Sequence, residues 1–273
     1  MRSKLDTIAK ISTEINVINS VAIQNLNLNE TQTKNYWLFM SDFFEIVWIS
    51  WVFSWLSDVD MLAEKWRKLC IVISCDAGIC GSLNKRLFAK VKKVVDSDTD
   101  LFCVGKKSFN YFLDQWFNVV WCINDCKNST DLEILNQYLS NSINKKVYSQ
   151  VVVFSHSNRG VENFDLYTFS NDELQKFMKK FDVKYAFGTK WNVNCVMDDV
   201  SFKNAMMVQL SQYIVYGAWL STKNAEYSHC RAVSQLIAHN NFVKKCILSF
   251  NEKRQTLLTQ KVMELMSLEY SMS

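Results

Sequence analysis

The sequence predicts an α/β protein in which an antiparallel coiled coil of N- and C-terminal helices joins a small Rossmann-like α/β domain. Residues 1–60 contain neither Gly nor Pro, the residues that most often interrupt helices. Five of the six Gly residues lie in a middle zone, where short β-rich runs alternate with amphipathic stretches. We therefore expect an N-terminal coiled-coil helix over 1–60, an α/β domain over 66–200 and a C-terminal coiled-coil helix over 201–273.

The two terminal zones carry apolar residues at helical spacing. In the N-terminal zone these residues recur at steps of three and four, which places them on one helix face. They are Ile8, Ile11, Ile15, Ile18 and Ala22. In the C-terminal zone the spacing fits a coiled-coil seam with polar breaks. The seam consists of the apolar Val233, Leu236, Val243, Ile247, Phe250, Leu257 and Leu268 and the polar Asn240, Arg254, Lys261 and Glu264.

The middle zone alternates between strand and helix patterns, which is typical of a parallel, doubly wound sheet. Strands are expected at 69–73, 101–104, 118–123 and 147–154, and helices at 83–95, 108–116 and 131–143. Gly160 and Asn163 then mark a hairpin with 164–169 as one arm.

Composition and charge disfavour several classes of protein. The net charge of +4 over 273 residues is too small for the dense basic surface of a nucleic-acid binder. The nine Cys are odd in number and scattered, which favours reduced thiols over a secreted disulfide scaffold. Asp6, Lys10 and Glu14 interrupt the N-terminus, so no signal-peptide layout is expected there.

One stretch, 36–56, is rich in Trp and partly resembles a membrane segment. Asp42 and Glu45 fall inside it, and each would cost about 3 kcal/mol near the centre of a bilayer. The uncharged part that follows is shorter than the roughly 20 residues that a spanning helix needs. We expect a buried helix or a partner interface here, and no direct membrane span.

The most distinctive local string is Asp76-Ala77-Gly78-Ile79-Cys80-Gly81-Ser82-Leu83-Asn84, which follows a strand and opens a helix. One interpretation is phosphate binding at the helix N-terminus. The string lacks the Lys-Ser/Thr of a P-loop and the three Gly of a dinucleotide fingerprint. A tight turn, whose Gly residues meet backbone constraints, is therefore the preferred interpretation.

The sequence offers little for catalysis or metal binding. The Cys residues considered for a zinc site are Cys75, Cys80, Cys122 and Cys126. The first pair is spaced more widely than structural zinc pairs, which sit two to four residues apart. The only His residues are His156, His229 and His239, and no nucleophile elbow or HExxH string accompanies them. We expect no catalytic residue, no metal and no cofactor.

Three strings follow one another along the chain. The first holds Asp76, Gly78, Cys80, Gly81 and Asn84 in the turn, and the second is Gly105-Lys106-Lys107-Ser108. The third, near the C-terminus, holds Asn251, Arg254, Gln255, Thr259 and Glu264. Together they resemble the gamma subunit of F-type ATP synthases, whose corresponding patterns are Asp-x-Gly-Leu-Cys-Gly-x-x-Asn, Gly-Arg-Lys-Gly and Asn-x-x-Arg-Gln-x-x-Ile-Thr-x-Glu-Leu-x-Glu-Ile.

The chain also departs from this family. Ala77 stands where the family usually has Arg, Leu258 replaces an Ile, and Lys261 replaces the first Glu of the C-terminal pattern. The Lys-rich run of the family's first helix is missing from 16–28, and its Ser-Glu-x-x-x-Arg string is blurred in 221–231. The resemblance is therefore to a divergent member.

The resemblance implies a rotor shaft without an active site of its own. Its partners would be the alpha and beta subunits, the epsilon subunit and the membrane c-ring, with no nucleic acid. Asn251, Arg254, Gln255 and Thr259 match positions that contact a beta subunit. The implied location is peripheral, on the cytoplasmic face of the bacterial inner membrane or an equivalent organellar face.

Two interpretations from other classes remain open at this point. The first is a nucleotide-binding α/β enzyme that uses the turn between Gly78 and Gly81. The second is a coiled-coil membrane adaptor anchored by Trp48, Trp51 and Trp55.

Overall fold

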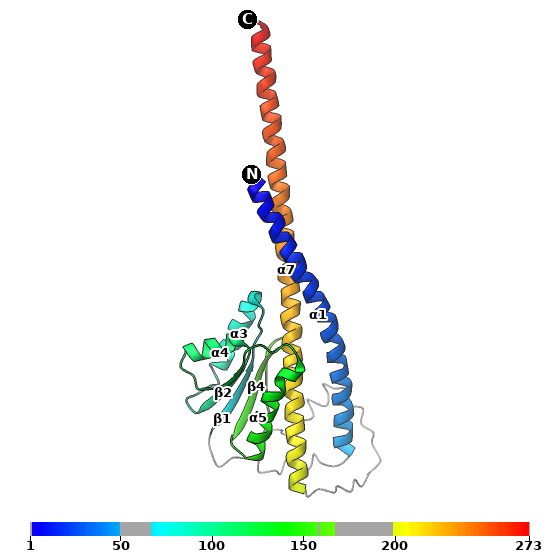
Figure 1. The fold of residues 1–273 in the computed structure, drawn as a ribbon, viewed down its shortest axis with the longest axis vertical. Coiled ribbons are helices and arrows are strands. Elements are labelled where there is room, and N and C mark those ends of the chain that lie inside the picture. Colours follow the sequence, from blue (N-terminus) through cyan, green and yellow to red (C-terminus); the bar gives the residue numbers. More distant parts are fainter. Residues whose placement is uncertain (1, 50–66, 158, 167–198, 273) are drawn as a thin grey trace. The chain divides into compact units, whose positions relative to one another are not determined.

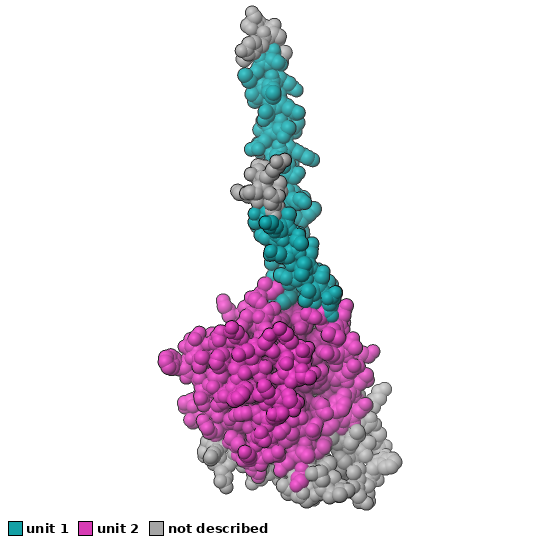
Figure 2. Space-filling view, viewed as in Figure 1, with its two compact units in different colours: residues 1–24, 228–273 teal, residues 25–227 magenta. Residues whose placement is uncertain are grey.

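The described residues form two long helices and a five-stranded sheet domain (Figure 1). The computed structural model describes residues 2–49, 67–157, 159–166 and 199–272. The chain forms two compact units: residues 25–227, and residues 1–24 together with 228–273 (Figure 2). Helices α1 (Arg2–Ile49) and α7 (Asp199–Met272) each contribute to both units.

The sheet of the larger unit has the strand order β3-β2-β1-β4-β5. Its strands are β1 (Lys68–Ile73), β2 (Thr99–Val104), β3 (Val119–Ile123), β4 (Gln150–Ser157) and β5 (Gly160–Asp165). The first four are parallel, and β5 is antiparallel to β4. The reversal of strand order on either side of β1 confirms the predicted doubly wound arrangement.

Three helices and two 3-10 turns connect the strands. They are η1 (Gly78–Cys80), α3 (Gly81–Val91), α4 (Lys106–Asp114), η2 (Ser129–Leu132) and α5 (Glu133–Asn144). The three α-helices each begin within two residues of the predicted start and end within four residues of the predicted end, whereas the 3-10 turns were not predicted. The strand predicted at 147–154 is β4, which begins three residues later than predicted, at Gln150. The chain still turns at Lys146, which has a positive φ of 48°.

Both faces of the sheet are buried at its central strands β1, β2 and β4, which explains why these strands are mostly apolar without regular polar alternation. On one face, Val72 and Cys103 pack against helices α3 and α4. On the other, Ile71 and Phe102 pack against α5 and α7. Successive strand residues point to opposite faces, so each strand supplies both layers.

Helix α7 is part of the sheet domain's core. Its residues Leu210, Ile214, Ala218 and Trp219 are all at most 3% exposed and belong to the same cluster as the sheet residues. From α1, Met40 joins this cluster and is fully buried. The sheet domain is therefore built onto the long helices by apolar packing.

The beginning of the Trp-rich stretch lies on this core. Tyr36, Trp37 and Phe43 are partly buried against it, as a buried helix requires. Residues 50–56, which include Trp51 and Trp55, are outside the described residues. In the part of the chain that the structure describes, we find no helix with the length and apolarity to cross a membrane.

The domain limits at 60, 66 and 200 stay predictions. The first two fall in 50–66, outside the described residues, and the third lies beside the undescribed 167–198. The hairpin is found as the antiparallel pair β4–β5, although its second arm begins at Gly160 instead of Phe164. Residues 167–169 of the predicted arm are again outside the described part.

The predicted seam of the helix pair is wrong in register on α7. Leu236, Val243 and Ile247 are 59%, 40% and 55% exposed, and Cys230, Ser234 and Asn241 are buried instead. The buried row lies one residue further along the helix. Sequence reasoning missed it because the row carries small and polar side chains where a coiled coil is expected to be apolar.

The predicted stripe on α1 is also only partly buried. Ile15 and Ala22 of the predicted stripe are buried, but Ile11 and Ile18 are 40% and 43% exposed. The smaller unit is thus a helix pair with a partly polar seam and apolar residues on its outside. The spacing of apolar residues alone cannot show which of two neighbouring faces of a helix packs against the other helix.

Gly105 follows β2, and Gly160 begins β5. Comparing the two glycines tests how closely other side chains approach the backbone at the end of β2. Both have positive φ, 109° and 127°. A Cβ on Gly105 would collide with Ser74 Oγ and lie 2.8 Å from Asp76 Oδ1, whereas a Cβ on Gly160 would meet nothing within 4 Å.

Gly160→Ala should lower the free energy of unfolding by about 1–3 kcal/mol through backbone strain alone. Gly105→Ala should cost about 1–3 kcal/mol more, because overpacking adds to the same strain. Urea unfolding of both variants measures the difference. Equal losses would contradict the close approach of Ser74 and Asp76 to Gly105.

Candidate functional site

The turn that follows β1 is fastened by one side chain. Asn84 on α3 accepts a hydrogen bond from the Cys75 N–H at 3.0 Å and donates one to the Cys75 carbonyl at 2.8 Å. Asn84 is buried, so these two bonds satisfy amide and backbone groups that water cannot reach. Asn84 therefore has a structural role: it closes the turn between Cys75 and α3.

The ends of β1 and β2 are tied to each other beside this turn. Ser74 Oγ donates to the Val104 carbonyl at 3.1 Å and lies 3.0 Å from Ser108 Oγ. Lys107 Nζ donates to the Ala77 carbonyl. The Gly105–Ser108 string thus holds the turn from the side of β2.

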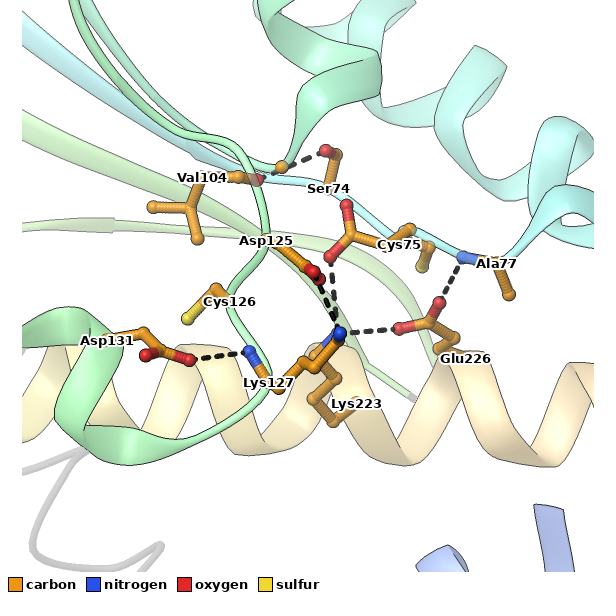
Figure 3. Close-up of polar contacts among 12 residues, drawn as sticks. Ser74, Cys75, Ala77, Val104, Asp125, Cys126, Lys127, Asp131, Lys223 and Glu226 are labelled. Carbon is orange, nitrogen blue, oxygen red and sulfur yellow. Dashed lines mark hydrogen bonds and ion pairs between the residues drawn. The ribbon is translucent and has the colours of Figure 1, made fainter. Parts of the chain in front are cut away.

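Helix α7 meets the turn from the other side (Figure 3). The Glu226 carboxylate accepts a hydrogen bond from the Ala77 N–H and lies 3.1 Å from Lys223 Nζ. Lys223 Nζ also lies 3.4 Å from an Asp76 carboxylate oxygen. We call Asp76, Lys223 and Glu226 the ion triad.

The ion triad is largely removed from water. The side chains of Lys223 and Glu226 are 9% and 4% exposed, and that of Asp76 is 26% exposed. A buried ammonium is stable only when carboxylates compensate its lost hydration. Two carboxylates face one ammonium here, so each member depends on the others.

Burial and charge act in opposite directions on the triad. Burial lowers the pKa of Lys223, but Glu226 and Asp76 outweigh it, so the net pKa is raised and the ammonium stays charged. Burial raises the pKa of Asp76, and Lys223 offsets this only in part. Together with the 3.4 Å separation, this makes Asp76 the more weakly held carboxylate.

The triad occupies the place where doubly wound sheets bind ligands. Such ligands lie beyond the carboxyl ends of the strands, where the strand order reverses, here between β1 and β4. At the end of β4, the His156 N–H donates to Thr222 Oγ1 at 3.1 Å, and at the end of β1 the turn binds Glu226. Side chains of α7 therefore fill this crevice.

This arrangement argues against phosphate binding by the turn. The backbone N–H of Ala77, one of the groups that a phosphate would need, already donates to a carboxylate of the same chain. Glu226 also brings a negative charge that would repel an anion. The tight-turn interpretation is supported, and the turn serves as a docking point for α7.

The cysteines considered for zinc are not arranged for it. Cys75, Cys80 and Cys126 are buried, and among the described residues no group of three or more His, Cys, Asp or Glu could hold a metal ion. Burial raises the pKa of Cys122 to about 11 and that of Cys126 to about 12, so both remain thiols near neutral pH.

The predicted partner-binding residues lie elsewhere, on the part of α7 that belongs to the smaller unit. Asn251, Arg254, Gln255 and Thr259 are all exposed on this helix. Thr259 Oγ1 donates to the Gln255 carbonyl at 3.0 Å, a contact within the helix. The structure therefore leaves their proposed role as a prediction.

Sequence reasoning missed the α7 half of the site. Lys223, Glu226 and Thr222 were not singled out, because a charged residue on a helix usually faces water. The one available signal was the blurred family string in 221–231, which contains the Glu that binds the turn.

Chains in solved structures of mitochondrial ATP synthases share this architecture. A chain of the Tetrahymena thermophila mitochondrial ATP synthase central stalk and c-ring matches with a TM-score of 0.56 and 16% identity, covering 81% of this chain and 97% of that one. A chain of the Euglena gracilis mitochondrial ATP synthase, rotational state 3, matches with a TM-score of 0.60 and 16% identity, covering 99% and 93%. These matches show that this chain shares the fold of those two chains.

Sequence comparison identifies the family. The family model described as ATP synthase matches residues 1–267. Relatives named ATP synthase gamma chain include those of Halothermothrix orenii, 22% identical over 74% of this chain and 72% of the relative, and Ruthia magnifica, 24% identical over 75% and 74%. The chain belongs to the ATP synthase gamma subunit family.

His156 beside the triad makes stability depend on pH. Its side chain is buried, and its Nε2 has no hydrogen-bond partner among the described residues. Burial lowers its pKa to about 4, against the opposing effect of Glu226. Below about pH 6.5 the unfolded chain binds a proton here that the folded chain binds only near pH 4.

The free energy of unfolding should therefore fall by up to about 3 kcal/mol more between pH 6.5 and pH 4 than it does in His156→Gln, which cannot titrate. His239→Gln, which replaces an exposed histidine, is the matched control. Urea unfolding at both pH values measures the effect. If His156→Gln has the same pH dependence as the wild type, folding does not lower the pKa of His156.

Proposed function

We propose that the chain is the central-stalk rotor of an F-type ATP synthase and couples proton translocation to ATP synthesis at the beta subunits by rotation. The observation that carries this proposal is the apolar outer surface of the smaller unit. On its α1 segment the exposed apolar residues are Ile11, Val17, Ile18 and Val21. On its α7 segment they are Leu236, Phe242, Val243, Ile247, Phe250, Leu257, Leu258, Val262, Met263, Leu265 and Met266.

Such a surface requires a partner that covers it. Contiguous exposed apolar patches mark interaction sites. Hydrophobic contact is also non-directional, so a helix with this surface can turn inside a protein sleeve without breaking directional bonds. A ring of alpha and beta subunits around the helix pair meets both requirements.

The long helices supply the stiffness that rotation needs. Helix α7 has 74 residues, which at 1.5 Å per residue is about 110 Å. The sequence has no Pro to interrupt its hydrogen bonds. Rotation of an asymmetric shaft would force each beta subunit in turn through open and closed states, and this requires no catalytic side chain on the shaft.

The remaining partners follow from the same proposal. The sheet domain meets the epsilon subunit and the membrane c-ring, and α1 and the C-terminal half of α7 meet the alpha and beta subunits. The chain is a non-catalytic component of the proton-transporting complex and binds no cofactor. Its location is peripheral, on the cytoplasmic face of the bacterial inner membrane or the equivalent organellar face.

Within this proposal, Asn251, Arg254, Gln255 and Thr259 form the beta-subunit contact. Their exposure on α7 leaves them available to a partner. Arg254 can bind a carboxylate through two parallel hydrogen bonds, which Lys cannot do.

Arg254→Ala should weaken coupling and leave the fold intact, because Ala favours helix and the side chain is exposed. ATP-driven proton pumping by a reconstituted complex measures this. Lys253→Ala removes a neighbouring exposed charge and is the control. If the complex that carries Arg254→Ala pumps protons as the wild type does, the proposed contact of Arg254 with a beta subunit does not contribute to coupling.

The rival function of a nucleotide-binding enzyme makes the opposite prediction about the isolated chain. Because Glu226 occupies the turn, titration with ATP or NAD should give no binding in the micromolar range. Micromolar binding would overturn the rotor proposal. Co-purification with alpha and beta subunits, followed by an ATPase assay, tests the proposal from the positive side.

A further inference from the structure

The sheet domain is held on α7 by two kinds of contact. The first is the apolar layer in which Ile214, Ala218 and Trp219 pack against the sheet. The second is the polar set at the carboxyl ends of the strands. The two contacts lie in succession along α7, the apolar layer from Met207 to Leu220 and the polar set from Thr222 to Glu226.

The polar contacts are concentrated in little more than one turn of helix. Thr222 accepts from the end of β4, Lys223 pairs with Asp76, and Glu226 accepts from the turn after β1. The Glu226 carbonyl also accepts a contact of 3.8 Å from Cys80 Sγ. Strands on both sides of the switch point are thus joined to the same short segment of α7.

These two kinds of contact resist different movements. Apolar packing is non-directional, so its strength depends little on the angle between the groups in contact. Hydrogen bonds and ion pairs weaken steeply when their distance and angle change. In a buried site, a displaced charge also loses its partner without regaining water. The ion triad therefore opposes sliding of the sheet domain along α7 and turning of the domain around it.

From this we infer that Lys223 and Glu226 are positioning residues for rotary coupling. They fix the turn at 75–80 to α7, so that torque applied to the sheet domain turns the helix instead of slipping past it. This inference rests on the proposed rotor function. It adds the place where torque passes from the domain to the shaft.

The test uses the reconstituted ATP synthase complex with the Lys223→Met chain. Met keeps the length and apolar stem of Lys but leaves Asp76 and Glu226 facing each other without a cation. ATP hydrolysis should continue, since α7 still turns within its sleeve. Protons pumped per ATP hydrolysed should fall to less than half of the wild-type ratio.

Two further variants separate positioning from stability. Lys223→Met/Glu226→Gln removes the unpaired charge and should recover assembly and thermal stability more than it recovers the pumping ratio. Lys90→Met removes a lysine on α3 that donates to the Val161 carbonyl on β5, within the sheet domain. It should keep the wild-type ratio.

A merely structural role would lower hydrolysis and pumping together and leave their ratio unchanged. An unchanged ratio in Lys223→Met would therefore overturn the inference. If that variant does not assemble, Glu226→Gln decides, because the amide keeps the side-chain shape and removes one charge that holds Lys223. Here too an unchanged ratio overturns the inference. Failure of the wild-type complex to pump would instead contradict the proposed function itself.

Discussion

Lys223 is a buried ammonium on α7, and it is stable there because the carboxylates of Asp76 and Glu226 face it. Much of the sheet domain is arranged around this constraint. Asn84 closes the turn that presents Asp76 and Ala77, and Lys107 holds that turn from the side of β2. The carboxyl ends of the parallel strands, which could have formed a ligand crevice, thereby become an attachment point for a helix.

This use of the crevice explains how a doubly wound domain can serve a mechanical role. The fold brings backbone N–H groups to the strand ends, where many proteins bind phosphate. Here the Ala77 N–H binds Glu226 of the same chain. The helix that carries Glu226 continues to Met272, with apolar side chains on its outside. One helix thus combines a directional, charged attachment and a non-directional, apolar surface.

The sequence was sufficient for the architecture and insufficient for the contacts. Apolar runs such as 69–73 placed the strands, because both sheet faces are buried and the pattern is unambiguous. The helix seam was misplaced because Ser234 and Asn241 are buried while Leu236 is exposed, and periodicity favours the apolar residue. Lys223 and Glu226 could not be predicted as site residues, because their partners Asp76 and Ala77 lie 147 and 149 residues away in the sequence.

Direct observation of rotation is the best test of whether this chain turns as a rotor. The alpha and beta subunits would be fixed to a surface, and a bead would be attached to the sheet domain. If the chain is the rotor, the bead should turn stepwise in one direction when ATP is added. A bead that stays still, or moves equally in both directions while ATP is hydrolysed, would contradict it.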